Sequence, residues 1–240
     1  MKIIISGYGR MGKEIEQAAL RLGHQIAARI DNEMQWKHWE QSGHSADVVI
    51  DFSMPDAVTQ IIERCFTLQL PVVTGTTGWY DNLERISENC KEINGTLFYA
   101  PNFSLGVNLF YMVNSFLART MSAFDEYNVH VEEVHHVHKL DAPSGTAIRT
   151  AELILGEDRR YHSWKSGSGA VKGELPVLSE RRGEVPGTHT VVYTSDADRI
   201  TLRHEAKNRS GFALGAVTAA EWVQTRKGVF TMSDYLKDLL

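Results

Sequence analysis

Three histidines and a lysine lie within five residues of the chain, at His135, His136, His138 and Lys139. Imidazole is the side chain whose charge changes near neutral pH, so such a group can exchange protons with a bound molecule. Burying these side chains is costly, and a strand does not need them. The segment is therefore a candidate site for chemistry on a small molecule.

A strand is expected over residues 127–138, because apolar and polar residues alternate there. On a strand, His135 and Lys139 share one face, and the other two histidines share the opposite face. A straight strand would hold His135 and Lys139 about 13 Å apart, at about 3.3 Å per residue. The two can share a substrate only if the chain bends near Leu140, and the nearby Pro143 favours such a bend.

Ser144, Gly145 and Thr146 are expected to open a helix that runs to Leu155. The first N–H groups of a helix have no acceptor within it, and the helix dipole adds partial positive charge there. Together with the Thr146 hydroxyl, these groups suit a substrate carboxylate. All three residues are therefore candidates for substrate binding.

Two other interpretations of the histidine cluster remain open. His136 and His138 could be metal ligands with Glu132 nearby, but no further ligand cluster completes such a site. The cluster could also be the solvated face of a strand, which would make Lys139 and the helix start a coincidence. We therefore expect no metal.

A second candidate site is a glycine loop between an expected strand and an expected helix, with the spacing G-x-G-x-x-G. The glycines allow a tight turn and bring backbone N–H groups close to a pyrophosphate at the helix start. Asp31 ends the next strand about 20 residues later, where a carboxylate can accept both ribose hydroxyls. The pattern predicts a dinucleotide site formed by Gly7, Tyr8, Gly9, Arg10, Met11, Gly12 and Asp31.

Two further loops follow later strands and would lie at the same edge of the sheet. Gly75, Thr76 and Thr77 follow a strand at 71–74, and Ala100, Pro101, Asn102 and Phe103 lie at the end of a strand at 96–100. Ligands bind outside the carboxyl ends of strands in an open α/β sheet. We expect these loops to face the nicotinamide half of the dinucleotide; turn formation and helix capping are their alternative roles.

Strands and helices alternate over the first hundred residues. Strands are expected at 2–6, 25–30, 46–51, 71–74 and 96–100, with helices after residue 10, after residue 54 and over 80–93. This order predicts an α/β fold with a Rossmann-like, doubly wound parallel sheet. The segment 32–45 is the weak point, since only 36–40 has a helical pattern where a crossover helix is needed.

The pattern changes after Asn102. Helices are expected at 105–121, 145–155 and 211–225, antiparallel strands at 190–193 and 199–204, and a mobile glycine-rich loop with short strands at 167–187. These elements predict a smaller α+β domain that holds the histidine cluster. We place a dinucleotide-binding domain at 1–104 and the substrate domain at 105–211, with 212–240 as a candidate to return to the first.

The bulk composition excludes several classes of protein. A net charge of −5 and a pI near 6.1 argue against binding to nucleic acid. The two cysteines, Cys65 and Cys90, fit a reducing compartment and form neither a disulfide framework nor a metal cluster. The N-terminal apolar run is too short for a signal peptide, and no run is long enough to span a membrane. We expect a cytoplasmic protein without membrane or nucleic-acid partners.

Together these motifs resemble the 4-hydroxy-tetrahydrodipicolinate reductase (dihydrodipicolinate reductase) family. The resemblance covers nearly the whole chain, and its most specific part is HHVHKLDAPSGTA, from His135 to Ala147. Besides the glycine loop, further matches lie at 51–53, 75–78, 102–108, 203–206 and 212–216.

The resemblance implies an enzyme of the diaminopimelate route to L-lysine, usually a homotetramer built through the second domain, that uses NADH or NADPH. The expected reaction reduces the dehydrated form of (2S,4S)-4-hydroxy-2,3,4,5-tetrahydrodipicolinate to tetrahydrodipicolinate by hydride transfer to the ring. By position, His135 corresponds to the general acid and Lys139 to a second proton donor. His136, Gly145 and Thr146 correspond to contacts with a carboxylate or the ring nitrogen.

The chain departs from the family pattern at Thr188, where most relatives have glutamate, and over 158–178, which looks shorter than usual. Both differences concern the loop that closes over substrate. Two alternative functions remain. Another NAD(P)-dependent amino-acid dehydrogenase would need a different substrate cluster, and a non-enzymatic nucleotide sensor has no use for His135 and Lys139 together.

We expect NADH to serve at least as well as NADPH. A 2′-phosphate beside Asp31 would meet a negative charge at short range. The residues that follow are Asn32 and Glu33 instead of an arginine, and the first cation after Asp31 is Lys37.

Overall fold

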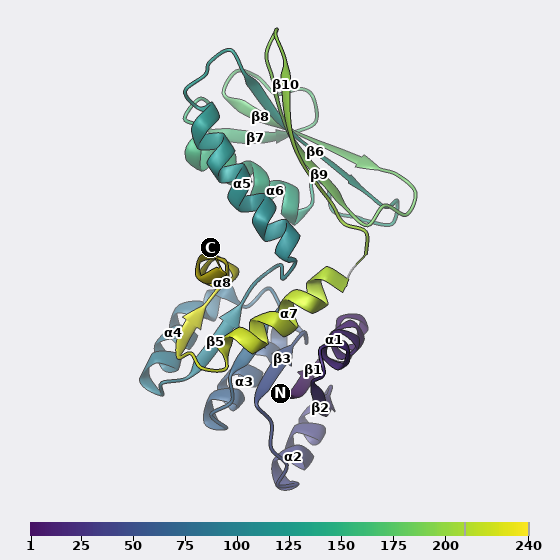
Figure 1. Ribbon diagram of the computed structural model, residues 1–240, viewed down its shortest axis with the longest axis vertical. Helices are drawn as coiled ribbons and strands as arrows, with labels where there is room; N and C mark the ends of the chain where they lie inside the picture. Colours follow the sequence, from purple (N-terminus) through teal and green to yellow (C-terminus); the bar gives the residue numbers. More distant parts are fainter. Residues whose placement is uncertain (209, 240) are drawn as a thin grey trace. The chain divides into compact units, whose positions relative to one another are not determined.

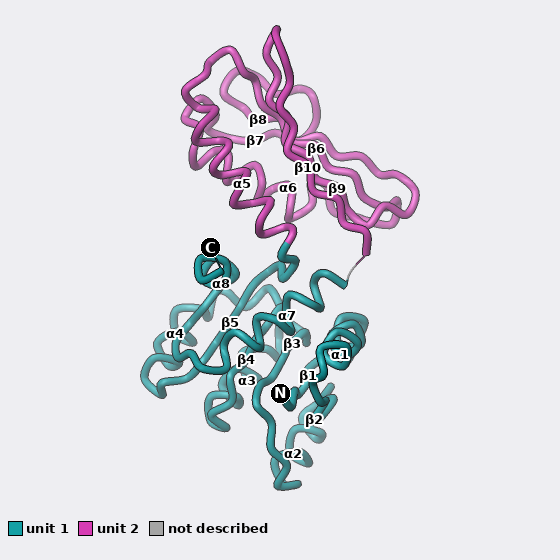
Figure 2. Tube along the Cα trace, in the orientation of Figure 1, with its two compact units in different colours: residues 1–105, 210–240 teal, residues 106–209 magenta. Residues whose placement is uncertain are grey.

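The computed structural model describes residues 1–208 and 210–239, which form two compact units (Figure 2). Unit 1 is built from residues 1–105 together with those from 210 onward, and unit 2 from residues 106 to 208. The chain therefore leaves unit 1 at Leu105 and has returned to it at Ser210, two residues before the boundary expected from the sequence.

A six-stranded parallel sheet forms the centre of unit 1 (Figure 1). Its strands are β1 (Lys2–Ser6), β2 (Gln25–Ile30), β3 (Val48–Asp51), β4 (Val72–Thr74), β5 (Thr96–Tyr99) and β11 (Gly228–Phe230), in the order β11-β5-β4-β3-β1-β2. The run Ile3, Ile4 and Ile5 is completely buried, as expected where helices cover both faces of a parallel sheet. The strand order reverses between β1 and β3, which is where open α/β sheets bind ligands.

Helices cover both faces of this sheet. On one face lie α2 (Glu33–Gln41), α3 (Pro55–Thr67) and α4 (Leu83–Glu92), the last preceded by the 3₁₀ turn η1 (Tyr80–Asn82), over a core that includes Ile4. On the other lie α1 (Arg10–Arg21), α7 (Ser210–Val223) and α8 (Met232–Leu239), over a core that includes Ile3 and Ile5. Successive isoleucines thus pack into the cores on opposite faces of the sheet, because side chains alternate along a strand.

Helix α7 approaches the loop after β5 very closely. Its buried residues are mostly alanine, and a Cβ built on Gly215 would lie 1.8 Å from the carbonyl oxygen of Phe103. A larger residue at 215 would therefore push the helix away from that loop. The C-terminal segment is an integral part of the core of unit 1.

Unit 2 is a five-stranded mixed sheet with helices on one face (Figure 1). Its strands are β6 (Asn128–His135), β7 (Ser163–Ser166), β8 (Glu174–Arg181), β9 (Thr188–Thr194) and β10 (Arg199–Glu205), in the order β10-β9-β6-β8-β7. Strand β6 is parallel to β8 and antiparallel to β9. Helices α5 (Leu105–Met121) and α6 (Gly145–Glu157) pack against the inward side chains Val129, Val131, Val177 and Val191.

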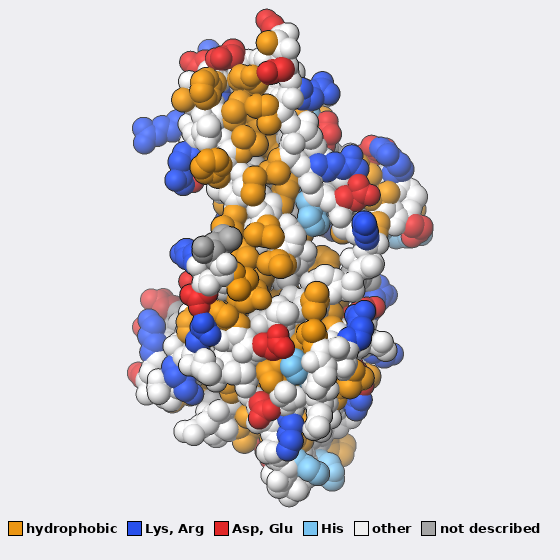
Figure 3. Space-filling view, in the orientation of Figure 1, with side chains coloured by type: hydrophobic (Ala, Val, Ile, Leu, Met, Phe, Trp, Pro, Cys, Tyr) orange, Lys and Arg blue, Asp and Glu red, His pale blue; other side chains and the backbone are white. Residues whose placement is uncertain are grey.

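Helix α5 also carries an apolar stripe on its outer face. Leu109, Met112, Val113 and Phe116 have the spacing of one helix face, and Phe116 is 70% exposed. Figure 3 shows hydrophobic side chains gathered over this helix. A stripe of this size is typical of a surface that contacts another protein.

The expected fold class is confirmed, but three segments differ from the sequence prediction. The weak crossover at 32–45 contains a nine-residue helix, α2, whose start is capped by the Asn32 side chain. The segment 167–187, expected to be a mobile loop with short strands, contains the eight-residue strand β8, whose Leu175 and Val177 are fully buried. Strand β11 and helix α8 were not foreseen. Over the described residues, no helix has the length and apolar character needed to cross a membrane.

Candidate functional site

The glycine loop after β1 has a backbone that other residues could not adopt. Gly7 has a φ of +83°, and a Cβ there would lie 2.4 Å from the carbonyl oxygen of Phe52, after β3. A Cβ on Gly12 would lie 2.5 Å from the carbonyl oxygen of Gly7. The first glycine thus permits the turn, and the last lets helix α1 pack against it.

Gly9 differs from its neighbours because the space around it is open. It is the exposed N-cap residue of α1, and a Cβ there would meet nothing within 4 Å. The helix has no side-chain cap and no acidic residue in its first turn. Its first N–H groups are therefore accessible to an anion, and the loop fits a dinucleotide pyrophosphate.

Asp31 follows β2 and holds the glycine loop. Its Oδ1 accepts a hydrogen bond of 2.5 Å from the backbone N–H of Tyr8, and its own N–H donates to the side chain of Gln35 at 2.6 Å. Arg29 lies over the Tyr8 ring, and both side chains donate to the carboxylate of Glu16. The exposed Asp31 thus ties the loop to the end of β2, where a ribose would lie.

A buried carboxylate organises the loop after β4. Asp51, at the end of β3, is completely buried, and its Oδ2 accepts hydrogen bonds of 2.8 Å from the hydroxyls of Thr74 and Thr76. Burial raises the pKa of Asp51, although the hydrogen bonds from Thr74 and Thr76 act in the opposite direction. The Thr76 hydroxyl therefore already bonds to another residue of the protein, whereas Thr77 and Gly78 are exposed.

The loop after β5 offers both buried and exposed residues. Ala100 and Phe103 are buried, so only their backbone could meet a ligand, whereas Pro101 is exposed. The Asn102 side chain accepts a hydrogen bond from the N–H of Ser104 at 2.9 Å. These residues lie in unit 1 with the glycine loop, at the carboxyl ends of its strands.

In unit 2, the strand register gathers four charged or titratable side chains. Inward positions of β6 alternate from Val129 and Val131 to Glu133 and His135, so the apolar core ends in polar groups. Glu133 pairs with His189 on β9, and His135 pairs with Arg181 on β8.

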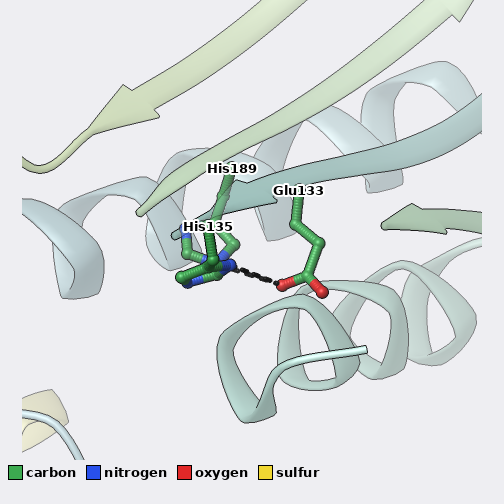
Figure 4. A group of neighbouring side chains, drawn as sticks. All are labelled: Glu133, His135 and His189. Carbon is green, nitrogen blue, oxygen red and sulfur yellow. Dashed lines mark ion pairs between the residues drawn. The ribbon is translucent and has the colours of Figure 1, made fainter. Parts of the chain in front are cut away.

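Glu133 is the centre of this cluster (Figure 4). Its Oε2 lies 3.2 Å from Nδ1 of His135 and 3.9 Å from Nε2 of His189. Its Oε1 accepts hydrogen bonds from the N–H of Ser144 at 3.0 Å and from Arg181 at 3.3 Å. The carboxylate therefore contacts β6, β8, β9 and the start of α6.

The pKa values of Glu133 and His189 are both shifted, and these shifts determine which members of the cluster are charged. Burial opposes ionisation of Glu133, but the adjacent imidazole of His135 and hydrogen bonds from Ser144 and Ser179 outweigh it and hold its pKa well below the usual range. Burial, followed by the charge of His135, lowers the pKa of His189 to about 3. At neutral pH the cluster thus holds an ionised carboxylate and an uncharged His189.

The strand ends earlier than the sequence predicts. Strand β6 stops at His135, and a turn follows in which the N–H of Lys139 donates to the carbonyl of His136 at 3.2 Å. The expected bend near Leu140 is therefore found at 136–139, and the two-faced strand arrangement does not extend past His135. The hydrogen-bonded turn replaces the strand geometry that would separate His135 from Lys139.

Arg181 fixes this turn from the neighbouring strand. Its guanidinium donates to the carbonyl of Lys139 at 3.3 Å and to that of Asp141. The ammonium of Lys139 lies 2.7 Å from Oδ1 of Asp141 and lowers the pKa of that carboxyl group. Lys139 thus has a defined position although its side chain is partly exposed.

The metal site considered from the sequence is not assembled. Glu132 pairs with His130 at 3.0 Å, and His138 pairs with Glu184 at 3.3 Å. Within the described residues, the ligand atoms that do converge, within 4.8 Å of one another, are those of Glu133, His135 and His189.

The N-terminus of α6 lies beside this cluster. Ser144 is buried, its hydroxyl caps the N–H of Ala147 at 3.2 Å, and it lies 3.2 Å from Nε2 of His189. Gly145 is exposed, and the Thr146 hydroxyl bonds to Tyr111. Across the part of the chain that is described, the N–H groups of Gly145 and Thr146 have no acceptor, so they are available to an anion.

Comparison with known families decides the classification. Residues 1–103 match the family model described as dihydrodipicolinate reductase, N-terminus, and residues 106–236 match the one described as its C-terminus. The chain belongs to the dihydrodipicolinate reductase family. The family's two models together cover nearly all of the sequence.

Individual dihydrodipicolinate reductases agree with this. The 4-hydroxy-tetrahydrodipicolinate reductase of Christiangramia forsetii is 44% identical over 239 residues, covering 100% of this chain and 99% of the relative. That of Archaeoglobus fulgidus is 33% identical over 262 residues, covering 99% and 100%. The dipicolinate-bound structure of dihydrodipicolinate reductase from Paenisporosarcina sp. TG-14 has the same fold, with a TM-score of 0.79, 23% identity and coverage of 96% and 97%.

As a dihydrodipicolinate reductase, the chain is an NAD(P)H-dependent oxidoreductase of lysine and diaminopimelate biosynthesis. The alternatives of a different amino-acid dehydrogenase and a nucleotide sensor are not favoured.

Sequence reasoning did not select Glu133, Arg181 or His189 as site residues. The available signal for Glu133 was weak, since it is one of two adjacent glutamates before the histidines. His189 and Arg181 are more than 40 residues away in sequence, and only the pairing of β9 and β8 with β6 brings them in.

Proposed function

We propose that His135 and Lys139 supply the acid–base chemistry for reduction of the dehydrated form of 4-hydroxy-tetrahydrodipicolinate to tetrahydrodipicolinate. The observation that carries this is the buried Glu133–His135 pair beside the start of α6, with Lys139 turned back at the end of the same strand. Reduced nicotinamide supplies the hydride when bound.

The protein's own part is to place protons and positive charge. Hydride addition to a conjugated imine leaves negative charge shared between the ring nitrogen and the ring carbon next to the one that accepted the hydride. His135 donates a proton to that carbon, and the Lys139 ammonium stabilises the developing charge. A positioned proton donor of this kind contributes about 10²–10⁴-fold to the rate.

The substrate carboxylate is assigned to the start of α6. The N–H groups of Gly145 and Thr146, which have no acceptor among the described residues, support this together with the helix dipole. His136 lies directly after His135 at the end of β6. Ser144 receives a different role from the one expected, because it is buried and its hydroxyl and N–H are both used within the protein. We propose that Ser144 orients Glu133 and His189 instead of contacting substrate.

The dinucleotide is assigned to unit 1. The pyrophosphate would lie against the loop Gly7–Gly12, the adenosine ribose against Asp31, and the nicotinamide half against the loops at 75–77 and 100–103. The open space around Gly9 and the uncapped start of α1 support this assignment. Unit 2 would hold the substrate.

We propose that NADH serves at least as well as NADPH. Asp31 is exposed at the end of β2, and two nearby cations already have partners. Arg29 pairs with Glu16, and Lys37 lies 4.0 Å from Glu33. A 2′-phosphate would therefore meet the Asp31 carboxylate, while Arg29 and Lys37 are already paired with glutamates.

We also propose that the protein is a homotetramer and that it is located in the cytoplasm. The apolar stripe on α5 supports association of the chain with other copies, and the family's biosynthetic role supports the location. Sedimentation equilibrium would test the first, and cell fractionation the second.

The decisive experiment is a turnover assay under anaerobic conditions, with substrate generated by the coupled synthase and NADH followed by its absorbance. Oxidation of NADH that depends on the synthase product is expected. Equal oxidation without the product, or none with it, would refute the proposed function.

A further inference from the structure

We propose that Glu133 is a positioning residue for the reaction: it faces Nδ1 of His135, fixes the orientation of this imidazole, and leaves Nε2 as the proton donor. This inference rests on the proposed role of His135. Glu133 itself is enclosed by protein and would not touch the substrate.

The geometry gives His135 little freedom. Its side chain is 9% exposed and its Nδ1 lies 3.2 Å from a carboxylate that is fully buried. On the other side of the ring, a Cβ built on Gly187 would lie 3.1 Å from Nε2, so glycine preserves the space beside that nitrogen. One ring nitrogen thus faces Glu133, and the other faces the space that the absent side chain leaves.

The carboxylate is held on its other side as well. Oε1 of Glu133 accepts from the Ser144 N–H and from Arg181, which leaves Oε2 for the imidazoles. The same Arg181 fixes the turn that carries Lys139. One buried acid therefore links both proposed proton donors to the start of α6.

The charged groups around His135 come from every element packed against it. Strand β6 contributes Glu133, β8 contributes Arg181, the turn contributes Lys139 with its partner Asp141, and β9 contributes His189. His204 on β10 also acts on His189, whose pKa is lowered to about 3. Because His189 stays uncharged at neutral pH, it adds no positive charge beside Glu133 and His135.

A cation is the competing occupant, since these three side chains could ligate a metal ion. The guanidinium of Arg181 already donates to the same carboxylate, and a second positive charge there would be repelled. The arrangement therefore favours a proton over a metal.

The test is Glu133→Gln, which keeps the shape and the acceptor for Ser144 but removes the charge. The matched control is Glu132→Gln, the same substitution at the preceding residue, which pairs with His130. In Glu133→Gln, kcat is expected to fall at least about tenfold with the KM for NADH unchanged. Glu133→Asp, which keeps the carboxylate, should restore part of the lost kcat.

The outcomes separate this inference from the proposed function. Normal kcat in His135→Gln would refute both. Loss of activity in His135→Gln, with normal kcat in Glu133→Gln, would refute only the role of Glu133. Loss of wild-type activity after dialysis against a chelator, restored by Zn²⁺, would show that the cluster holds a metal and would also refute it.

A measurement on the unmodified protein covers the case in which Glu133→Gln does not fold. Nitrogen NMR of ¹⁵N-histidine protein, with His135 assigned from the His135→Gln variant, reports which ring nitrogen carries the proton. Above the pH at which His135 becomes neutral, the proton is expected on Nδ1, facing Glu133. A neutral ring protonated at Nε2 would overturn the inference.

Discussion

The hydroxyl of Thr76 donates a 2.8 Å hydrogen bond to the fully buried carboxylate of Asp51, so the loop after β4 is anchored from beneath by the end of β3. Thr74 donates to the same oxygen atom. Strand β1 lies beside β3, and Ser6 at its end also bonds to Asp51. One acid therefore sets the relative positions of three strand ends at the proposed nicotinamide site.

Asp51→Asn is expected to raise the KM for NADH about fivefold to tenfold. A neutral amide oxygen is a weaker acceptor than a carboxylate oxygen, so the hydrogen bonds from Thr74 and Thr76 weaken. A loss of about 1 kcal/mol in these bonds would leave the loop after β4 less well ordered. Steady-state kinetics with substrate at saturation would measure the change. Asp56→Asn, at an exposed position in the first turn of α3, is the control and should leave the KM unchanged.

His135→Gln and Lys139→Ala are each expected to lower kcat by at least about 10², with the affinity for NADH nearly unchanged. Both residues lie in unit 2, whereas the proposed dinucleotide residues lie in unit 1. Stopped-flow turnover and fluorescence titration with NADH would measure the two quantities. His138→Gln serves as the control, since that side chain is 72% exposed and pairs with Glu184. Near-normal kcat in either variant would contradict the assigned role.

Asp31→Ala is expected to reduce the difference in kcat/KM between NADH and NADPH, because kcat/KM with NADH should fall more than kcat/KM with NADPH. At an effective dielectric near 20, a charge pair at about 6 Å is worth about 3 kcal/mol, and solvent and salt reduce this to about 1 kcal/mol, or fivefold. The measurement is kcat/KM with each cofactor at one ionic strength. Because Asp31 also holds the Tyr8 N–H, both values should decrease in the variant. A wild-type preference for NADPH would mean that a basic group reaches the 2′-phosphate.

The stability of unit 2 should depend on pH through His189. Its pKa is about 3 in the folded protein, below the ordinary value of 6.5. As the pH falls below 6.5, the unfolded chain takes up a proton here and the folded chain does not, so the free energy of unfolding decreases until the pH reaches about 3. The loss is at most about 1.4 kcal/mol per pH unit.

His189→Asn should therefore show a flatter decline of the thermal unfolding midpoint between pH 6.5 and pH 4 than the wild type. His138→Asn, at an exposed position, should keep the wild-type decline. Parallel curves for all three proteins would exclude His189 as the source of the pH dependence.

Local sequence was sufficient for those features that depend on neighbouring residues. The turn at Gly7 needs a positive φ and a missing side chain, and both requirements are visible in the glycine spacing. The start of α6 at Ser144 is likewise a local capping pattern. For this reason the nucleotide loop and the helix start were predicted at their observed positions.

Features that depend on strand pairing could not be predicted in this way. The contacts of Glu133 with His189 and Arg181 exist because β9 and β8 flank β6 in one particular register, which no local pattern encodes. The place of the turn before Lys139 has the same origin, since Arg181 on β8 holds the carbonyl of Lys139. The strand β8 itself also depends on tertiary contacts. Its sequence contains a proline and several charged residues, so its two buried positions do not stand out as a strand pattern.

The return of α7 to unit 1 has a consequence for synthesis on the ribosome. Ile3, Ile5 and Val48 share a core with the alanines of α7, which are translated some 160 residues or more after Val48. The face of the sheet that α7 covers must stay open while the whole of unit 2 is being made, whereas unit 2 is continuous in sequence. During translation, unit 2 is therefore expected to reach its folded state first, and the nascent N-terminal segment is the part that needs chaperone protection until the last helix emerges.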